Sequence, residues 1–151
     1  MNIFHRKSLL AACIAAMMGL HGYAQKNEAS PRLSDYFSPA TTNTMSPDSE
    51  GFIQRWLLLE PIDKPNPSNT VFTDSYIATE YFPNQFTVLP KDGDKVKVGK
   101  QKLTWHALDS KLFNVKLFRF ASGLKKQVYG VLFWAVTVIE CPEDMENIRM
   151  S

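Results

Sequence analysis

The sequence predicts an all-β fold, an antiparallel β-sandwich with one short helix. After residue 50 the chain contains about seven short runs rich in β-branched and aromatic residues, separated by turn signals about every 8–12 residues. The runs do not alternate with long amphipathic helices. This lack of βαβ alternation argues against a nucleotide-binding α/β fold.

Residues 1–24 have the order and lengths of a secretory signal peptide. Arg6 and Lys7 form a basic start, Ser8–Leu20 is apolar and uncharged, and residues 22–24 (GYA) match a cleavage site of small residues. We therefore expect cleavage after Ala24 and export to the periplasm, the cell surface or the medium. The apolar stretch is too short for a transmembrane helix, which needs about 20 residues.

A lipoprotein signal is the alternative, because Leu10-Ala11-Ala12-Cys13 has the residue types of a lipobox. It is less favoured, since only five residues separate Lys7 from Cys13. The apolar stretch Ile14–Leu20 would also follow the lipid, where a polar tether is usual.

Cleavage would leave 151 − 24 = 127 residues, enough for one domain. Arg6 and Lys7 would leave with the signal, so 17 − 2 = 15 basic residues remain against 15 acidic ones. This balance gives no electrostatic reason to bind nucleic acid. His106 would be the only remaining histidine, and Cys141 the only remaining cysteine. We therefore expect neither a two-histidine zinc site nor an internal disulfide, and no metal or other cofactor.

Residues 25–50 form an extended lead-in before the sandwich domain of residues 51–151. The lead-in is rich in Ser, Thr, Asn and Pro and has no apolar period. Tyr36 and Phe37 are exceptions, and adjacent aromatic side chains seldom stay in water. We expect them to pin the lead-in to the domain as an ordered strap.

The first strand of the domain is expected within Phe52–Leu59, an apolar run that ends before a proline. Trp56 and Leu58 fall on one side of the strand, and Leu57 and Leu59 fall on the other. A strand with one wet face would alternate apolar and polar residues. The sequence therefore predicts a central strand covered on both faces.

The one expected helix is Thr73–Phe82, which has a capping Thr at its start and Pro83 directly after it. Ile77 and Tyr81 share one side of this helix. Phe86–Leu89 is expected as a short strand.

A hairpin is expected next. Lys95–Val98 alternates lysine and valine, Gly99-Lys100 suits a two-residue turn with glycine first, and Lys102–Ala107 is the return strand. Phe113–Phe120 is expected as another strand, after which Ala121–Lys126 reverses the chain.

Val128–Glu140 is the most apolar segment of the domain. As one strand it would be about 40 Å long at about 3.3 Å per residue, and it is apolar on both sides through Val131–Val136. We expect it to be the long central strand of the sheet. Met145–Ser151 starts another alternating strand that the chain does not continue. An unpaired edge there predicts self-association.

A Ser-His-Asp arrangement would have to use His106, with Asp109 and Ser110 nearby. On a strand, His106 and Ser110 would be about 13 Å apart at about 3.3 Å per residue. A triad needs direct hydrogen bonds, and no glycine-rich oxyanion loop is close in sequence. We expect no catalytic residue. A small exported hydrolase using His106 is kept as an alternative function.

Acidic residues give no clear site either. Glu60, Glu80 and Glu140 lie at the ends of apolar segments, where a solvated charge is as good an explanation as a glycosidase carboxylate pair. Asp92-Gly93-Asp94 resembles part of a calcium loop but lacks the downstream glutamate, so an ordinary turn is favoured.

Aromatic residues are the positive signal for binding. Removing Phe4 and Tyr23 from the 18 aromatics leaves 16 in 127 residues. Sugars stack their C–H faces on aromatic rings. Trp105 with His106 and Lys102, or Tyr81 at the end of the expected helix, could form such a contact. Core packing is the competing interpretation for Trp105, because a Trp within a strand is usually buried.

Three stretches resemble the galactose-binding-like jelly-roll modules that accompany secreted bacterial carbohydrate-active enzymes. Phe52–Ile62 resembles their opening strand, Gly99–Ser110 resembles a later strand with a central Trp, and Val128–Ser151 resembles a long strand followed by "C-P-E" and a charged strand. From Pro31 onward the chain looks like the start of secreted acetylxylan esterases. The family's final strands have no counterpart after Ser151.

This resemblance implies a non-catalytic accessory module that scaffolds or weakly binds a plant-type polysaccharide. Any esterase activity would belong to a parent protein of which this chain is a truncated part. The third interpretation, an envelope interaction protein, follows from the unpaired edge expected at Met145–Ser151.

Overall fold

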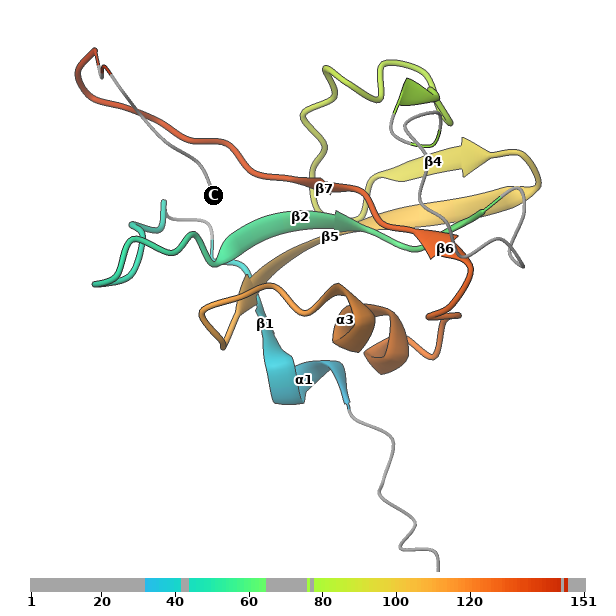
Figure 1. Ribbon diagram of the computed structural model, residues 1–151, viewed down its shortest axis with the longest axis horizontal. Coiled ribbons are helices and arrows are strands. Elements are labelled where there is room, and N and C mark those ends of the chain that lie inside the picture. The colour runs from blue at the N-terminus through green and yellow to red at the C-terminus, as the bar shows by residue number, and fades with distance from the viewer. Residues whose placement is uncertain (1–31, 42–43, 65–75, 77, 145, 147–151) are drawn as a thin grey trace, which may run out of the picture.

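The computed structural model describes residues 32–41, 44–64, 76, 78–144 and 146. This part of the chain consists mostly of β-strands in antiparallel sheets, with two short helices (Figure 1). The expected signal peptide lies outside the described residues. So does the strand expected at Met145–Ser151, apart from Glu146.

The elements follow one another in chain order as α1 (Leu33–Tyr36), β1 (Phe37–Pro39), β2 (Arg55–Leu59), β3 (Ile62–Asp63), β4 (Lys95–Val98), β5 (Gln101–Ser110), α3 (Leu117–Gly123), β6 (Val131–Leu132) and β7 (Ala135–Val136). The larger sheet has the order β1-β5-β2-β7, with β4 also paired to β5. β3 and β6 form a second, two-stranded sheet.

Strand β5 organises the larger sheet because it is long enough to pair with three other strands. β2 lies along one edge of β5, with Leu59 opposite Trp105 and Arg55 opposite Asp109. β4 and β1 follow one another along the other edge of β5. Residues far apart in sequence therefore meet on a single strand.

Strand β2 confirms the expectation of a central strand covered on both faces. It lies between β5 and β7, and both of its neighbours are antiparallel. Trp56 and Leu58 pack into one core cluster, and Leu57 and Leu59 pack into the other. The continuous apolar run was therefore a correct signal for burial on two sides.

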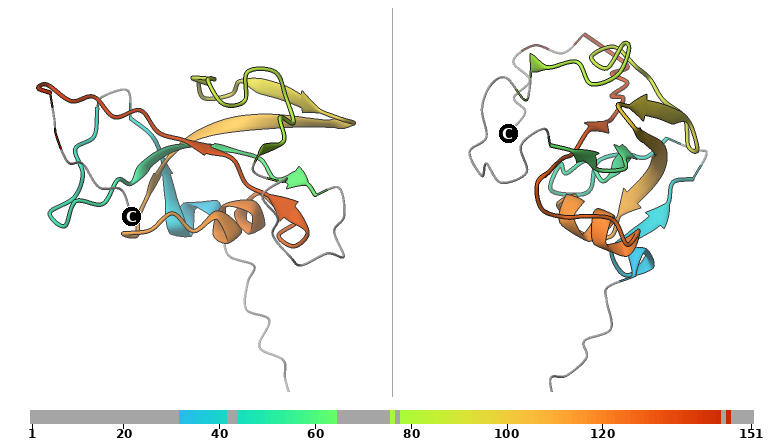
Figure 2. Two further views of the ribbon diagram at one scale, coloured as in Figure 1. Left: turned by 45° about the horizontal axis from the view of Figure 1, so that its top comes forward. Right: turned by 90° about the vertical axis from the view of Figure 1, so that its right-hand side faces the viewer.

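The two faces of the sheet have different covers. The helix face, with its core of Phe37, Leu58, Leu108 and Phe120, lies against α1 and α3. The loop face, with its core of Leu59, Ile62, Phe82, Leu103 and Trp105, lies against residues 78–90 and the β3–β6 pair. Figure 2 shows the helices on one side of the sheet and the green-yellow loop on the other.

The expected hairpin is confirmed. β4 pairs with β5 from Lys95 opposite Thr104 to Val98 opposite Gln101. Gly99 has a φ of 56°, which a glycine adopts without steric cost at the first position of such a turn. Both valines of β4 are half-buried against the loop-face core, and both lysines are exposed.

The expected strand Phe113–Phe120 is wrong, because residues 113–116 form no strand and helix α3 begins at Leu117. Leu117, Phe120 and Leu124 recur at helical spacing and pack together into the helix-face core, with Ala121 also buried. The strand prediction overlooked this 3.6-residue period. The structure thus has two described helices where one was expected elsewhere.

The two helices touch at Gly123. A Cβ atom placed on Gly123 would lie 2.7 Å from both the backbone nitrogen and the Cα of Leu33. Only glycine permits so close an approach without a backbone shift. The lead-in is also fixed at this place, because Phe37 is buried and meets the Phe120 ring edge-on at 6.2 Å.

The expected long central strand Val128–Glu140 is wrong. Its residues form two separate two-residue strands: β6 pairs with β3, and β7 pairs with β2 at the end of the sheet order. Gly130 has a φ of 65°, and Val138 and Ile139 are more than half exposed. The available partners explain the break, since β2 has five residues and β3 has two.

The expected helix Thr73–Phe82 lies partly outside the described residues. Tyr76 and Ala78 are helical, but the helix has ended by Thr79, before Pro83. Phe86–Leu89 forms no strand. The loop is instead held by the buried side chain of Gln85, which accepts a hydrogen bond from the Tyr81 amide at 2.8 Å and donates one to the Thr79 carbonyl at 3.2 Å.

Candidate functional site

The loop face contains a hollow of about 380 Å³ where its cover is incomplete. Aromatic and aliphatic side chains line this aromatic hollow: Ile62, Tyr76, Tyr81, Val131, Leu132, Phe133 and Trp134. They come from β3, the loop before residue 90, β6 and the link between β6 and β7. A mostly apolar concavity with few polar groups is the usual form of a small-molecule site.

Tyr81 supplies a polar group of the hollow. Its hydroxyl oxygen is buried and makes no hydrogen bond of standard geometry within the described part of the chain, although Thr79 lies nearby. Burial raises the pKa of Tyr81, because it disfavours the phenolate, and the Thr79 side chain opposes this shift. Tyr81 therefore stays a neutral donor at ordinary pH.

Trp134 and Tyr76 have ring partners that limit their movement. Trp134 meets Phe86 edge-on, with ring centroids 5.6 Å apart. The Lys64 ammonium nitrogen lies 5.4 Å from the centre of the Tyr76 ring. A cation beside an aromatic hollow offers a second polar group at its rim.

Trp105 lies inside the loop-face core and is 0% exposed. Its ring meets Phe82 edge-on at 6.2 Å. In this fold, neither face of the Trp105 ring is accessible to a sugar. Its neighbour His106 points to the opposite side of the sheet, so the two side chains do not form one platform.

His106 belongs to a small polar cluster on the helix face. Its Nε2 lies 3.7 Å from a carboxylate oxygen of Glu60, too far for a hydrogen bond, and its ring meets Phe120 edge-on at 5.6 Å. The Lys126 ammonium lies 3.3 Å from the other Glu60 oxygen. That oxygen also accepts a hydrogen bond from the Thr104 amide.

The three residues considered for a triad have separate partners. The Asp109 carboxylate accepts two hydrogen bonds from Arg55, at 2.8 and 2.9 Å. The Ser110 hydroxyl contacts the carbonyls of Leu112 and Asn114, both at 3.0 Å. Neither side chain is hydrogen-bonded to His106 in the described part of the chain, so the arrangement does not form the relay that acyl transfer needs.

Asp92-Gly93-Asp94 forms the favoured turn, and both carboxylates are engaged. Asp92 accepts a hydrogen bond from the Ala107 amide, and Asp94 accepts one from the Lys91 amide, each at 2.8 Å. Glu80 and Glu140 are exposed, whereas Glu60 is buried and ion-paired. Among the residues that the structure describes, no group of three or more His, Cys, Asp or Glu side chains could hold a metal ion.

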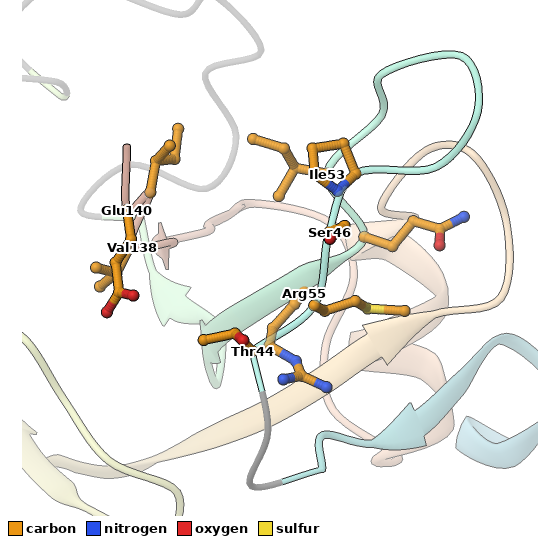
Figure 3. A pocket seen from close by; sticks show the side chains of 10 residues that line it. Thr44, Ser46, Ile53, Arg55, Val138 and Glu140 are labelled. Carbon is orange, nitrogen blue, oxygen red and sulfur yellow. The ribbon is translucent and has the colours of Figure 1, made fainter. Parts of the chain in front are cut away.

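A second hollow of about 390 Å³ lies at the opposite end of the sheet. In Figure 3, Val138 and Glu140 stand on one side of it, and Ser46 and Ile53 stand on the other. It is open because the chain leaves the β2 edge after Thr137, whose hydroxyl donates to the Arg55 carbonyl. The hollow has no aromatic side chain in its lining, so it is a weaker candidate for sugar stacking.

Arg55 lines this second hollow, but its guanidinium is already hydrogen-bonded to other side chains. Its guanidinium binds Asp109 through two nitrogens and reaches the Thr41 hydroxyl at 2.8 Å. The hydrogen bonds to Asp109 raise the pKa of Arg55, so the pair stays charged. This pair fastens the end of β2 to the end of β5.

Cys141 is exposed and unbonded. Within the described ranges, the structure contains no helix that combines the length and the apolar character needed to cross a lipid bilayer. Comparison with known proteins finds no matching family model, no matching curated protein and no matching solved structure.

Sequence reasoning found Tyr81 but missed its neighbours Tyr76, Phe133 and Trp134. It had assigned Phe133 and Trp134 to a long buried strand. The available signal was Gly130, whose position inside an apolar run indicates a bend. A bend there would have freed the residues after it from the centre of a sheet.

Proposed function

We propose that this chain is a non-catalytic module of an exported polysaccharide-degrading protein of the acetylxylan esterase type, with a jelly-roll β-sandwich architecture. Its role is to scaffold the parent protein and to bind carbohydrate weakly. The aromatic hollow is the observation that carries the binding part of the proposal. It combines several rings with the buried hydroxyl of Tyr81.

The sandwich part of the proposal is supported by the loop-face core. Ile62 of β3 and Leu132 of β6 pack into the same cluster as Leu103 and Trp105 of the larger sheet. Two sheets of a sandwich share a core in this way. The β3–β6 pair is then the described part of the second layer.

The hollow suits a neutral sugar ring better than an anion. Its lining contains no charged side chain, and the nearby Lys64 ammonium lies over the Tyr76 ring. Ring faces would contact the C–H groups of a sugar, and the Tyr81 hydroxyl, which is buried in the free protein, would donate to one sugar hydroxyl once the sugar displaces the loop around it. A partly filled, pre-formed hollow of this kind predicts weak binding, with a dissociation constant on the order of 1 mM.

The test is calorimetric titration of the purified protein with neutral xylo-oligosaccharides. Tyr81→Ala should abolish binding, and Tyr81→Phe should weaken it by removing only the hydroxyl. Leu89→Ala is the matched control, because Leu89 is 72% exposed on the same loop and does not line the hollow. No binding by the wild type, or equal loss in the control, would reject the carbohydrate site.

The same protein separates this proposal from the alternative hydrolase. His106→Ala should leave sugar binding unchanged, because His106 lies on the other face of the sheet. If the wild type hydrolyses an acetyl ester and His106→Ala abolishes that turnover, the hydrolase interpretation replaces the non-catalytic one.

A further inference from the structure

The charges of this chain balance overall but are unevenly distributed. Between residues 110 and 139 there is no acidic residue, while five basic residues occur there: Lys111, Lys116, Arg119, Lys125 and Lys126. This segment contains α3 and its flanks. This segment of the helix layer therefore carries an excess of positive charge.

A row of rings crosses the same surface. The Arg119 guanidinium lies 5.1 Å from the centre of the Tyr36 ring and 5.5 Å from that of Phe118. Phe118 in turn meets Tyr129, with ring centroids 6.2 Å apart. We call these four residues the aromatic strip. They come from α1, α3 and the segment before β6, and Figure 1 shows α1 and α3 side by side.

Phe118 and Tyr129 of the aromatic strip are not part of the core, whereas Tyr36 packs against the helix-face core. Tyr129 is 77% exposed and Phe118 is 43% exposed, whereas Phe120 directly beneath the helix is 0% exposed. Phe118 and Tyr129 are therefore not needed to close the helix-face core. Binding a partner over these two neighbouring rings would remove their exposed apolar surface from water, which is favourable.

The positive charge beside the strip is not neutralised by the fold. Lys116, Arg119 and Lys125 make no ion pair with the part of the chain that the structure describes. The nearby acids are occupied: Glu60 pairs with Lys126, and Asp35 pairs with Arg32. An anionic partner would meet unpaired cations here, and exposed rings would lie between them.

We infer that the aromatic strip and its flanking cations bind an acidic polysaccharide, one whose sugar rings carry carboxylates. The sugar rings would stack on Phe118 and Tyr129, while the carboxylates pair with Arg119 and the lysines. An anionic membrane fits less well, because the apolar side of α3 faces the core and is not available to a bilayer. The inference rests on the proposed glycan-associated function, but it uses a different face of the sheet.

The test is affinity electrophoresis of the purified protein in gels containing polygalacturonate, with neutral xylan and plain gels as reference. Lys116→Glu combined with Lys125→Glu should weaken the retention by about tenfold, since two favourable charge pairs become repulsive. Tyr129→Ala should weaken it by about 2- to 10-fold. Added salt should weaken it as well.

Lys95→Glu combined with Lys97→Glu is the matched control. Both lysines are exposed on the β4 hairpin, and the net charge changes by the same amount. This control should keep most of the retention. Equal loss in the two double variants would mean that only the net charge matters and would overturn the inference. Thermal unfolding should be unchanged in all three variants.

Two further outcomes would also overturn it. One is no retention of the wild type by polygalacturonate. The other is binding to phosphatidylglycerol vesicles without binding to polygalacturonate, which would assign the strip to a membrane. Tyr81→Ala should not affect polygalacturonate retention. A failure of neutral-sugar binding in the aromatic hollow is therefore distinguishable from a failure at the strip.

Discussion

The two faces of the sheet bury similar apolar side chains but are covered by different kinds of structure. On the helix face, α1 and α3 touch at Gly123 and close over Phe37 and Phe120. On the loop face, the cover is a non-repetitive loop tied by Gln85, and it leaves the aromatic hollow open. Regular elements pack densely, whereas a loop held at a few points leaves room for a ligand.

The largest expected effect is on the loop face, from Trp105→Ala. Trp105 is fully buried between the sheet and Phe82, so its removal leaves a large cavity. We expect a loss of about 3–5 kcal/mol in the free energy of unfolding, measured by urea denaturation. The half-buried Trp56 on the helix face is the comparison, and Trp56→Ala should cost less. An equal cost would show that the two faces do not differ in this way.

Gly123→Ala tests the close contact on the helix face. The new methyl group would lie 2.7 Å from the Leu33 backbone, so α1 must shift. We expect a loss of about 1–3 kcal/mol in the same denaturation measurement. Ser122→Ala, one position earlier in α3, should change the stability by less. Neutral-sugar binding in the hollow should survive Gly123→Ala, because the contact lies on the other face.

The buried Tyr81 on the loop face predicts that the free energy of unfolding depends on pH. Its pKa is raised above the ordinary value of 10.0, mainly by burial. The unfolded chain therefore ionises first as the pH rises, and the free energy of unfolding falls above pH 10.0. Tyr81→Phe should lose less stability than the wild type across this range. Parallel pH profiles for the two proteins would contradict the burial of the hydroxyl.

The smallest expected effect is that of Tyr129→Ala. Tyr129 is 77% exposed and lies outside both core clusters. Its substitution should change the free energy of unfolding by no more than about 0.5 kcal/mol. A substantially larger loss would mean that the aromatic strip supports the fold.

Sequence patterns predicted the parts of the fold that depend on the local order of apolar and polar side chains. The doubly apolar run of β2 and the alternating β4 with its Gly99 turn are both present. Phe37 was also correctly expected to pin the lead-in. Each of these signals lies within a few residues, and each states directly which side chains are buried.

Prediction failed where the choice of partner decides the structure. Val128–Glu140 is apolar enough for a long strand, but the strands beside it are short, so it divides between two sheets. Leu117–Gly123 was assigned to a strand although Leu117 and Phe120 recur at helical spacing, and the helix packs these side chains into the helix-face core. Tyr81 was predicted as a candidate, but the rings around it depend on the loop path and had no local signal.

The Asp92 carboxylate has a consequence for how the domain behaves toward other chains. Along one edge of β5, the backbone pairing passes from β4 to Gly93 and Asp94, and resumes at Ala40 beyond β1. The Asp92 carboxylate accepts the Ala107 amide between these two segments. Two fragments more than fifty residues apart in sequence thus occupy one continuous border of β5, and a foreign strand would have to pair with the outer edge of β1 or β4 instead.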